Sequence, residues 1–309
     1  MCIHCGLIGR LLGTFLVGGA LAIVSAAAKS GGPAAITAAD AGTCLNPSEI
    51  ADPTDAVSRN RANLAAPQLC VMRYGFDEGG LNWQLLVVRN TSHPATVLWV
   101  VPHDNEGAAF DSAVQGVRKY GGTVVAVKTG GERLNHGQDP NRNFDLGSGP
   151  LCPGQQSRSP LYTAQILRWR IGGASVVGLH TNDQGFDGDG KGGSGTVSIR
   201  LSSKGLKPFP APHAIGASPD DTMVYVASKL APSGDAGLKQ LVDRLNARRV
   251  NVAYEIVSPA SNDCSLSNYS VLGGIPRYFN VEAVHGDVAG HRAVVETLMT
   301  EIGVAPLDN

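Results

Sequence analysis

The chain has 309 residues, of which 43% are hydrophobic and 17% are charged. That hydrophobic content excludes an intrinsically disordered protein. The 25 basic and 26 acidic residues leave no basic excess of the kind that nucleic-acid-binding proteins carry, so we expect a folded chain without a nucleic-acid partner.

The first segment has the features of a secretory signal. Arg10 precedes an apolar run, residues 11–28, that ends in Ser-Ala-Ala-Ala. A basic start, an apolar run and small residues at the cleavage position predict a signal peptide cut after Ala28. An uncleaved anchor is the alternative, because a run of this length just spans a bilayer. We expect a secreted or periplasmic protein, with no stable membrane partner once residues 1–28 are removed.

Four cysteines follow the signal, namely Cys44, Cys70, Cys152 and Cys264. An even number in an oxidising compartment favours two disulfides, and three pairings are possible. Closeness along the chain favours Cys44–Cys70 with Cys152–Cys264. Residues 29–66, rich in Ala, Pro, Ser and Asp, are interpreted as an N-terminal extension that Cys44 tethers, with a short helix after residue 53.

Strands and helices alternate from residue 67 onward. Strands at 69–74 and 83–88 flank a Gly-rich turn, and the apolar run 96–101 is typical of a strand buried on both faces. Helical spacing begins at about Gly107 and ends at Gly121-Gly122. Further strands are expected at 123–127, 174–179, 196–201, 222–227, 251–257 and 278–284, and further helices at 160–170, 236–248 and 288–301.

This alternation predicts an α/β fold. Residues 67–309 are expected to form a single catalytic domain with a mixed, mostly parallel central sheet flanked by helices. Functional residues in such sheets gather at the carboxyl ends of the strands.

Two histidines follow the most apolar strands. His103 comes after 96–101, with Glu106 three residues later at the start of a helix, and His180 comes after 174–179. Imidazole and carboxylate suit Zn²⁺, and three protein ligands leave a fourth position for water, as in catalytic sites. A histidine with its hydrogen bonds satisfied in the protein interior is the alternative for His180.

Glu282 lies in the otherwise apolar strand 278–284. A carboxylate there is costly unless it is paired or functional. It is either a general base toward a metal-bound water or a buried ion-pair partner.

Between the two histidines lies the sequence Arg-Leu-Asn-His-Gly-Gln-Asp-Pro-Asn-Arg-Asn-Phe, residues 133–144. The order His-x-x-Glu, Asp-x-Asn-Arg-Asn-Phe, strand-end His and late-strand Glu resembles the zinc metallocarboxypeptidase family. This family includes carboxypeptidase A-like and murein peptide amidase-like exopeptidases. The resemblance covers roughly residues 95–290 and implies the fold of that family.

The resemblance implies a metal centre. His103, Glu106 and His180 would ligate zinc, and Asp139 would orient His103. Such a carboxylate partner supports most zinc-bound histidines.

The resemblance also implies roles around the substrate. Asn141 and Arg142 would hold its terminal carboxylate, because the planar guanidinium matches two carboxylate oxygens. Arg133 would polarise the scissile carbonyl, and Glu282 would be the general base and then the general acid.

We therefore expect an exported zinc hydrolase that cleaves an amide bond near a free carboxylate, with cell-wall peptides as one substrate class. An aspartoacylase-type hydrolase of N-acyl amino acids and a non-catalytic peptide- or glycan-binding relative are the alternatives. The chain departs from the family at 257–264, which lacks the tyrosine that caps the substrate about two dozen residues before the catalytic Glu. The oligomeric state stays open.

Overall fold

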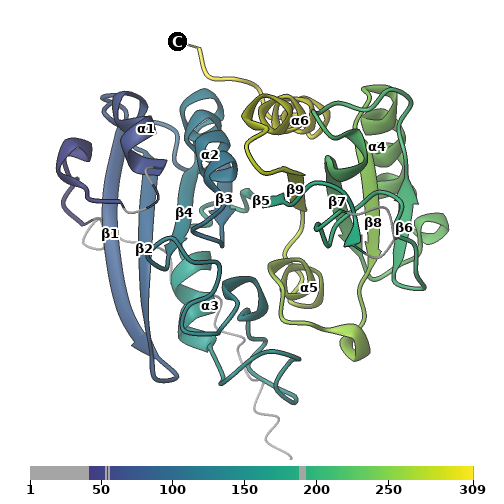
Figure 1. Ribbon diagram of the computed structural model, residues 1–309, viewed down its shortest axis with the longest axis horizontal. Coiled ribbons are helices and arrows are strands. Elements are labelled where there is room, and N and C mark those ends of the chain that lie inside the picture. The colour runs from purple at the N-terminus through teal and green to yellow at the C-terminus, as the bar shows by residue number, and fades with distance from the viewer. Residues whose placement is uncertain (1–41, 53, 55, 188–192, 309) are drawn as a thin grey trace, which may run out of the picture. The chain divides into compact units, whose positions relative to one another are not determined.

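Four parallel strands form the middle of the sheet. The computed structural model describes residues 42–52, 54, 56–187 and 193–308, all within the compact unit Pro33–Asn309. Nine strands pair in the order β1-β2-β4-β3-β5-β9-β7-β8-β6 (Figure 1). The central parallel strands are β4 (Thr123–Lys128), β3 (Val97–Val101), β5 (Ser175–Asn182) and β9 (Tyr278–Val284). The predicted signal, residues 1–28, lies outside the described residues.

Antiparallel pairing occurs on both sides of this centre. One side carries β1 (Leu69–Glu78) and β2 (Leu81–Asn90), and the other carries β7 (Met223–Ser228), β8 (Asn251–Ile256) and β6 (Leu206–Phe209). Strands β1, β2 and β4 are joined by antiparallel pairs, β7 is antiparallel to β9, and β8 is parallel to β7 but antiparallel to β6. The predicted α/β fold with a mixed sheet is confirmed, with parallel pairing concentrated in the central strands.

Helices cover both faces of the sheet. The core of one face includes residues of α1 (Ala56–Leu64), α2 (Gly107–Tyr120), α4 (Ala236–Ala247) and α6 (Val288–Glu301). The core of the other face includes residues of α3 (Pro160–Leu167) and α5 (Leu266–Leu272). Strand β3 shows why its sequence is continuously apolar, because Trp99 faces the first core while Leu98 and Val100 face the second.

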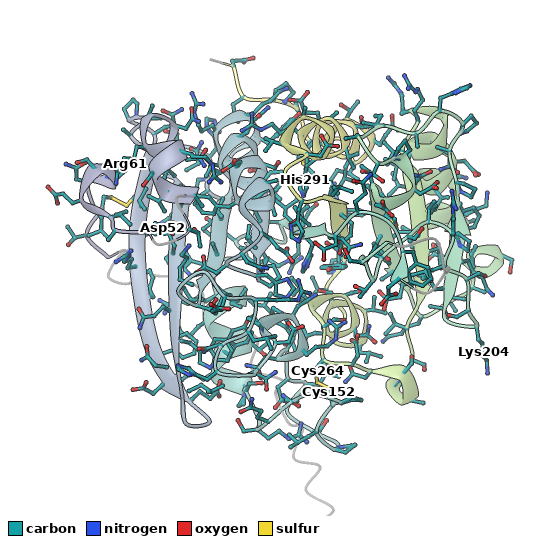
Figure 2. The ribbon with its side chains drawn as sticks, viewed as in Figure 1. Asp52, Arg61, Cys152, Lys204, Cys264 and His291 are labelled. Carbon is teal, nitrogen blue, oxygen red and sulfur yellow. A yellow bond between two sulfur atoms is a disulfide. The ribbon has the colours of Figure 1, made fainter. Side chains whose placement is uncertain are left out.

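Both predicted disulfides are present. Cys44–Cys70 ties the described part of the N-terminal extension to β1, and Ile50, Val57 and Leu64 pack into the first core. Cys152–Cys264 joins the segment before α3 to the loop before α5 (Figure 2).

No helix in the described ranges is long and apolar enough to cross a bilayer.

The strand predicted at 196–201 is wrong. These residues form an irregular loop with a turn at 199–200, and the Ile199 backbone N–H donates to Asp220 O rather than to a neighbouring strand. Polar and apolar residues do alternate in this segment, but no strand lies beside it to pair with. Helix α5 and the edge strand β6 were not predicted from the sequence. Strand β6 contains Pro208, a residue tolerated only where a backbone donor is not needed.

Candidate metal-dependent active site

The order of the central strands brings the two histidines together. Strands β3 and β5 are parallel neighbours, so their carboxyl ends lie side by side. His103 follows β3, Glu106 lies at the start of α2, and His180 lies near the end of β5. All three side chains are buried, although each of them is polar.

The potential ligand atoms of these residues converge. His103 Nδ1 lies 3.3 Å from His180 Nδ1 and 2.7 Å from Glu106 Oε1. His180 Nδ1 lies 3.4 Å from Glu106 Oε2. Ligand atoms of a tetrahedral zinc with bonds of about 2.0–2.2 Å are separated by about 3.3–3.6 Å. Two of the three separations already have this size, so the donor set fits a zinc ion.

Asp139 fixes the orientation of the His103 ring. Its Oδ1 lies 2.9 Å from His103 Nε2 and accepts the Asn141 backbone N–H at 2.7 Å. A proton held on Nε2 by Asp139 leaves the Nδ1 lone pair directed at Glu106 and His180. Burial lowers the pKa of His103, but the Glu106 charge and the hydrogen bond to Asp139 outweigh burial and raise it to about 8. The position therefore favours a cation, whether a proton or a metal.

The Glu106 carboxylate is held in its ionised form. Besides His103, its Oε1 accepts a hydrogen bond from Arg133 Nη1 at 2.7 Å, and its Oε2 accepts the Thr181 backbone N–H at 3.0 Å. Burial alone would raise the pKa of Glu106, but the His103 charge and hydrogen bond lower it below its usual value. Arg133, which is half exposed, thus reaches the cluster through Glu106.

Glu282 lies beside His180 on the neighbouring strand. The two residues are partners in the β5–β9 register, and Asn280 Nδ2 donates to Glu282 Oε1 at 3.2 Å. Burial raises the pKa of Glu282, the His180 charge opposes that rise, and the Glu106 charge adds to it. A carboxyl group with a raised pKa suits proton transfer near neutral pH.

A cavity of about 330 Å³ opens onto this cluster. Predicted residues Glu106, Arg133, His180 and Glu282 line it. Its other lining residues are mostly polar and were not singled out from the sequence: Asn105, Thr181, Asn182, Asp183, Ser194, Thr196, Val197 and His285. The position of Thr181 and Asn182 directly after the strand-end histidine was the only signal for them.

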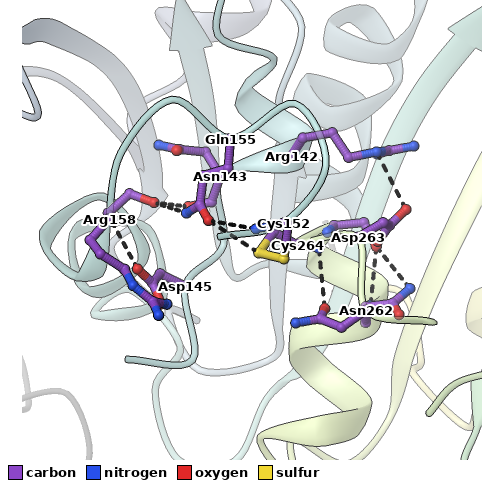
Figure 3. Close-up of a disulfide and its surroundings, with 12 residues drawn as sticks. Arg142, Asn143, Asp145, Cys152, Gln155, Arg158, Asn262, Asp263 and Cys264 are labelled. Atoms are coloured by element: carbon purple, nitrogen blue, oxygen red, sulfur yellow. Dashed lines mark hydrogen bonds and ion pairs between the residues drawn. A yellow bond between two sulfur atoms is a disulfide. The ribbon is translucent and has the colours of Figure 1, made fainter. Parts of the chain in front are cut away.

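The two residues predicted to bind the substrate carboxylate, Asn141 and Arg142, point in different directions. Asn141 Nδ2 lies 3.5 Å from His180 Nε2, so Asn141 borders the cluster of His103, Glu106 and His180. The Arg142 side chain is instead directed to Asp263 in the loop before α5, with Nε 3.3 Å from Asp263 Oδ2 (Figure 3). Of the eight predicted site residues, Arg142 is the one that neither contacts the cluster of His103, Glu106 and His180 nor lines the cavity, although its charge helps to lower the pKa of Asp139.

His291, on α6, is a supporting residue that was not predicted from the sequence (Figure 2). Its Nε2 lies 3.1 Å from the backbone oxygen of His180. Burial lowers the pKa of His291 to about 4, so the ring is neutral and its Nε2–H donates to that carbonyl. The hydrogen bond holds β5 against α6. The position of His291 on the apolar stripe with Val294 and Val295 was a usable signal.

We expect Asp139→Asn to lower zinc affinity by about 10- to 100-fold, because a neutral amide holds the imidazole less strongly in its metal-binding form. Asn retains an acceptor for the Asn141 N–H, so the local turn should persist. Zinc affinity is measured by competition with a chromophoric chelator. Asp235→Asn, at the N-cap of α4, is the matched control. Equal affinities for Asp139→Asn and the wild type would show that Asp139 does not support the metal.

No protein-family model and no curated protein matches the sequence. Among solved structures, the chain is similar to a protein from Shewanella amazonensis SB2B that is provisionally named a metallopeptidase. The identity is 14%, the TM-score is 0.42, and 82% of this chain and 93% of that chain are covered.

Two other similar structures have different names. A metallo-carboxypeptidase from Pseudomonas aeruginosa is 14% identical with a TM-score of 0.42, over 81% of this chain and 66% of that one. An aspartoacylase family protein from Mesorhizobium loti is 11% identical with a TM-score of 0.41, over 78% and 69%. At such identities and TM-scores, a function for this chain has to be inferred from its own side chains.

Proposed function

We propose that the protein is an exported, zinc-dependent hydrolase that cleaves an amide bond next to a free carboxylate, as its resemblance to zinc metallocarboxypeptidases implies. The convergence of His103, Glu106 and His180 beside a cavity that Glu282 lines carries the proposal. The two disulfides are consistent with export, because such bonds persist in oxidising compartments.

His103, Glu106 and His180 would hold the zinc. When bound, zinc supplies Lewis acidity, which lowers the pKa of water and polarises a carbonyl. Glu282 accepts the proton from the attacking water and later delivers it to the nitrogen of the leaving amine. Arg133 donates hydrogen bonds to the carbonyl oxygen as negative charge develops there.

Asn141 and Arg142 bind the carboxylate of the departing residue. The Asn141 amide borders His180, which puts a hydrogen-bond donor close to the reacting bond. The Arg142 guanidinium, which is partly exposed, supplies the positive charge that a carboxylate requires. Cleavage is then restricted to amide bonds one residue from a free carboxyl end.

Zinc-loaded protein is tested with three kinds of probe, namely N-acetyl dipeptides, cell-wall muropeptides with a free carboxyl end, and N-acetyl amino acids. Release of a C-terminal amino acid that stops with chelator supports the proposal. Turnover of N-acetyl amino acids alone would instead identify an aspartoacylase-type enzyme. Stoichiometric zinc and peptide binding without turnover would identify a non-catalytic relative.

We expect Arg142→Met to raise KM for an N-acetyl dipeptide by about 10- to 100-fold, because a hydrogen bond to a charged group contributes about 1.5–3 kcal/mol. The C-terminal amide of the same dipeptide serves as the control substrate, since it has no carboxylate for Arg142 to bind. KM values come from initial rates of amine release. An unchanged KM for the free acid would exclude Arg142 from carboxylate recognition.

A further inference from the structure

The loop before α5, residues 262–265, and the first residue of α5 are hydrogen-bonded to the segment that carries Asn141 and Arg142. Leu266 N donates to Asn141 Oδ1 at 3.1 Å, and Phe144 N donates to Cys264 O at 2.9 Å. Arg142 is the third link, through its ion pair with Asp263 in the same loop. Two segments more than one hundred residues apart in the sequence thus form one unit at the edge of the site.

The Cys152–Cys264 disulfide joins the same loop to the segment before α3 (Figure 3). Cys152 N donates to Gln155 Oε1 at 3.2 Å, and Gln155 Nε2 donates to Ser159 Oγ at 3.0 Å. The Ser159 hydroxyl in turn donates to the backbone oxygen of Asn143 at 2.7 Å. The residue after Arg142 is therefore held by the same covalently linked structure that holds Asp263.

Two contacts fix the plane of the Arg142 guanidinium. Nε faces Asp263, and Nη1 donates to the backbone oxygen of Asn141 at 2.9 Å. Both side chains of the ion pair are more than one third exposed, at 39% and 37%, so the pair itself contributes little to folding stability. Its effect is to restrict a long side chain that otherwise samples many rotamers.

We propose that Asp263, held in place by the Cys152–Cys264 disulfide, is a positioning residue that orients Arg142 toward the substrate carboxylate. This inference rests on the proposed function, which makes Arg142 the carboxylate-binding residue. It adds that tight substrate binding requires the oxidised disulfide. A competing role, in which Asp263 occupies Arg142 and excludes the substrate, predicts the opposite change in affinity.

The test measures KM, kcat and zinc content with the N-acetyl dipeptide that the wild type cleaves best. We expect Asp263→Ala to raise KM by about fivefold with kcat within about twofold of wild type. Asp263→Asn keeps an acceptor oxygen and should restore much of the affinity. The double variant Cys152→Ser/Cys264→Ser should raise KM by about tenfold or more, because the whole loop is released while zinc is retained.

Matched controls separate positioning from a general loss of stability. Cys44→Ser/Cys70→Ser removes the other disulfide, and Asp243→Ala removes a carboxylate that pairs with Lys239 on α4. Both should leave KM unchanged. Affinity for the C-terminal amide should not respond to Asp263→Ala, because the amide has no carboxylate to align with Arg142.

The inference is overturned if Asp263→Ala leaves KM unchanged, lowers it, or weakens acid and amide equally. If the cysteine variant does not fold, the Asp263 variants still decide the outcome. If the wild type shows no turnover, the proposed function is wrong, and the Kd of the same dipeptide, measured by calorimetry on zinc-loaded protein, replaces KM. An undetectable Kd for the wild type would then overturn this inference as well.

Discussion

Replacing Glu282 with Gln is expected to lower kcat by about 10³-fold while zinc content stays at one ion per chain. The amide has nearly the same shape as the carboxylate and keeps an oxygen for the Asn280 Nδ2 donor. It has no basic oxygen that can take a proton from water. The loss should therefore fall on kcat, with KM within about threefold, because the groups proposed to bind the substrate are unchanged.

Steady-state kinetics and metal analysis of the same preparation check this result. Glu301→Gln is the matched control, since Glu301 on α6 pairs with Arg244 at 2.9 Å and is not among the residues that line the cavity. Its kcat should match that of the wild type. If the Glu282 variant kept wild-type activity, Glu282 would be a buried structural carboxylate, and the proposed route of the proton would be wrong.

His180→Ala is expected to abolish stoichiometric zinc binding and all turnover. Removing one of three protein ligands should weaken zinc affinity by at least about 100-fold, because structural zinc sites gain about 10–16 kcal/mol from their complete ligand sets. The loss of zinc binding should also lower the thermal stability of the variant. Zinc at 1,000 times its Kd stabilises a folded protein by about 4 kcal/mol, or about 7 °C in Tm for a chain of this size.

Calorimetry with and without chelator measures that effect. Chelator should lower the Tm of the wild type and leave the Tm of His180→Ala unchanged. His291→Gln is the comparison, because it removes a buried imidazole that touches the His180 carbonyl without supplying a proposed ligand. It should be destabilised but still respond to chelator. Zinc bound to His180→Ala with wild-type affinity would contradict the proposed ligand set.

The prediction of elements succeeded where a sequence pattern had one structural outcome. Apolar runs long enough to be buried on both faces became β3 and β5, and the helices α2 and α6 follow their periodic apolar residues. The prediction failed where the presence of a neighbouring strand decides whether a segment becomes a strand. Residues 196–201 alternate as a strand does but meet no strand, whereas the partly buried segment Leu206–Phe209 becomes β6 because β8 offers it a free edge.

The sequence by itself determined which chemical groups this protein can bring to a metal. The apolar runs predicted that His103 and His180 lie at the carboxyl ends of two buried strands. His103 follows β3 after one intervening residue, and His180 lies within the last part of β5. The sequence could not determine neighbours across the sheet, because β9 pairs with β5 by a register that local sequence does not encode. Only the tertiary structure placed Glu282 beside His180. Contacts between distant loops likewise directed Arg142 to Asp263, since a long side chain takes its direction from whichever partner the fold supplies.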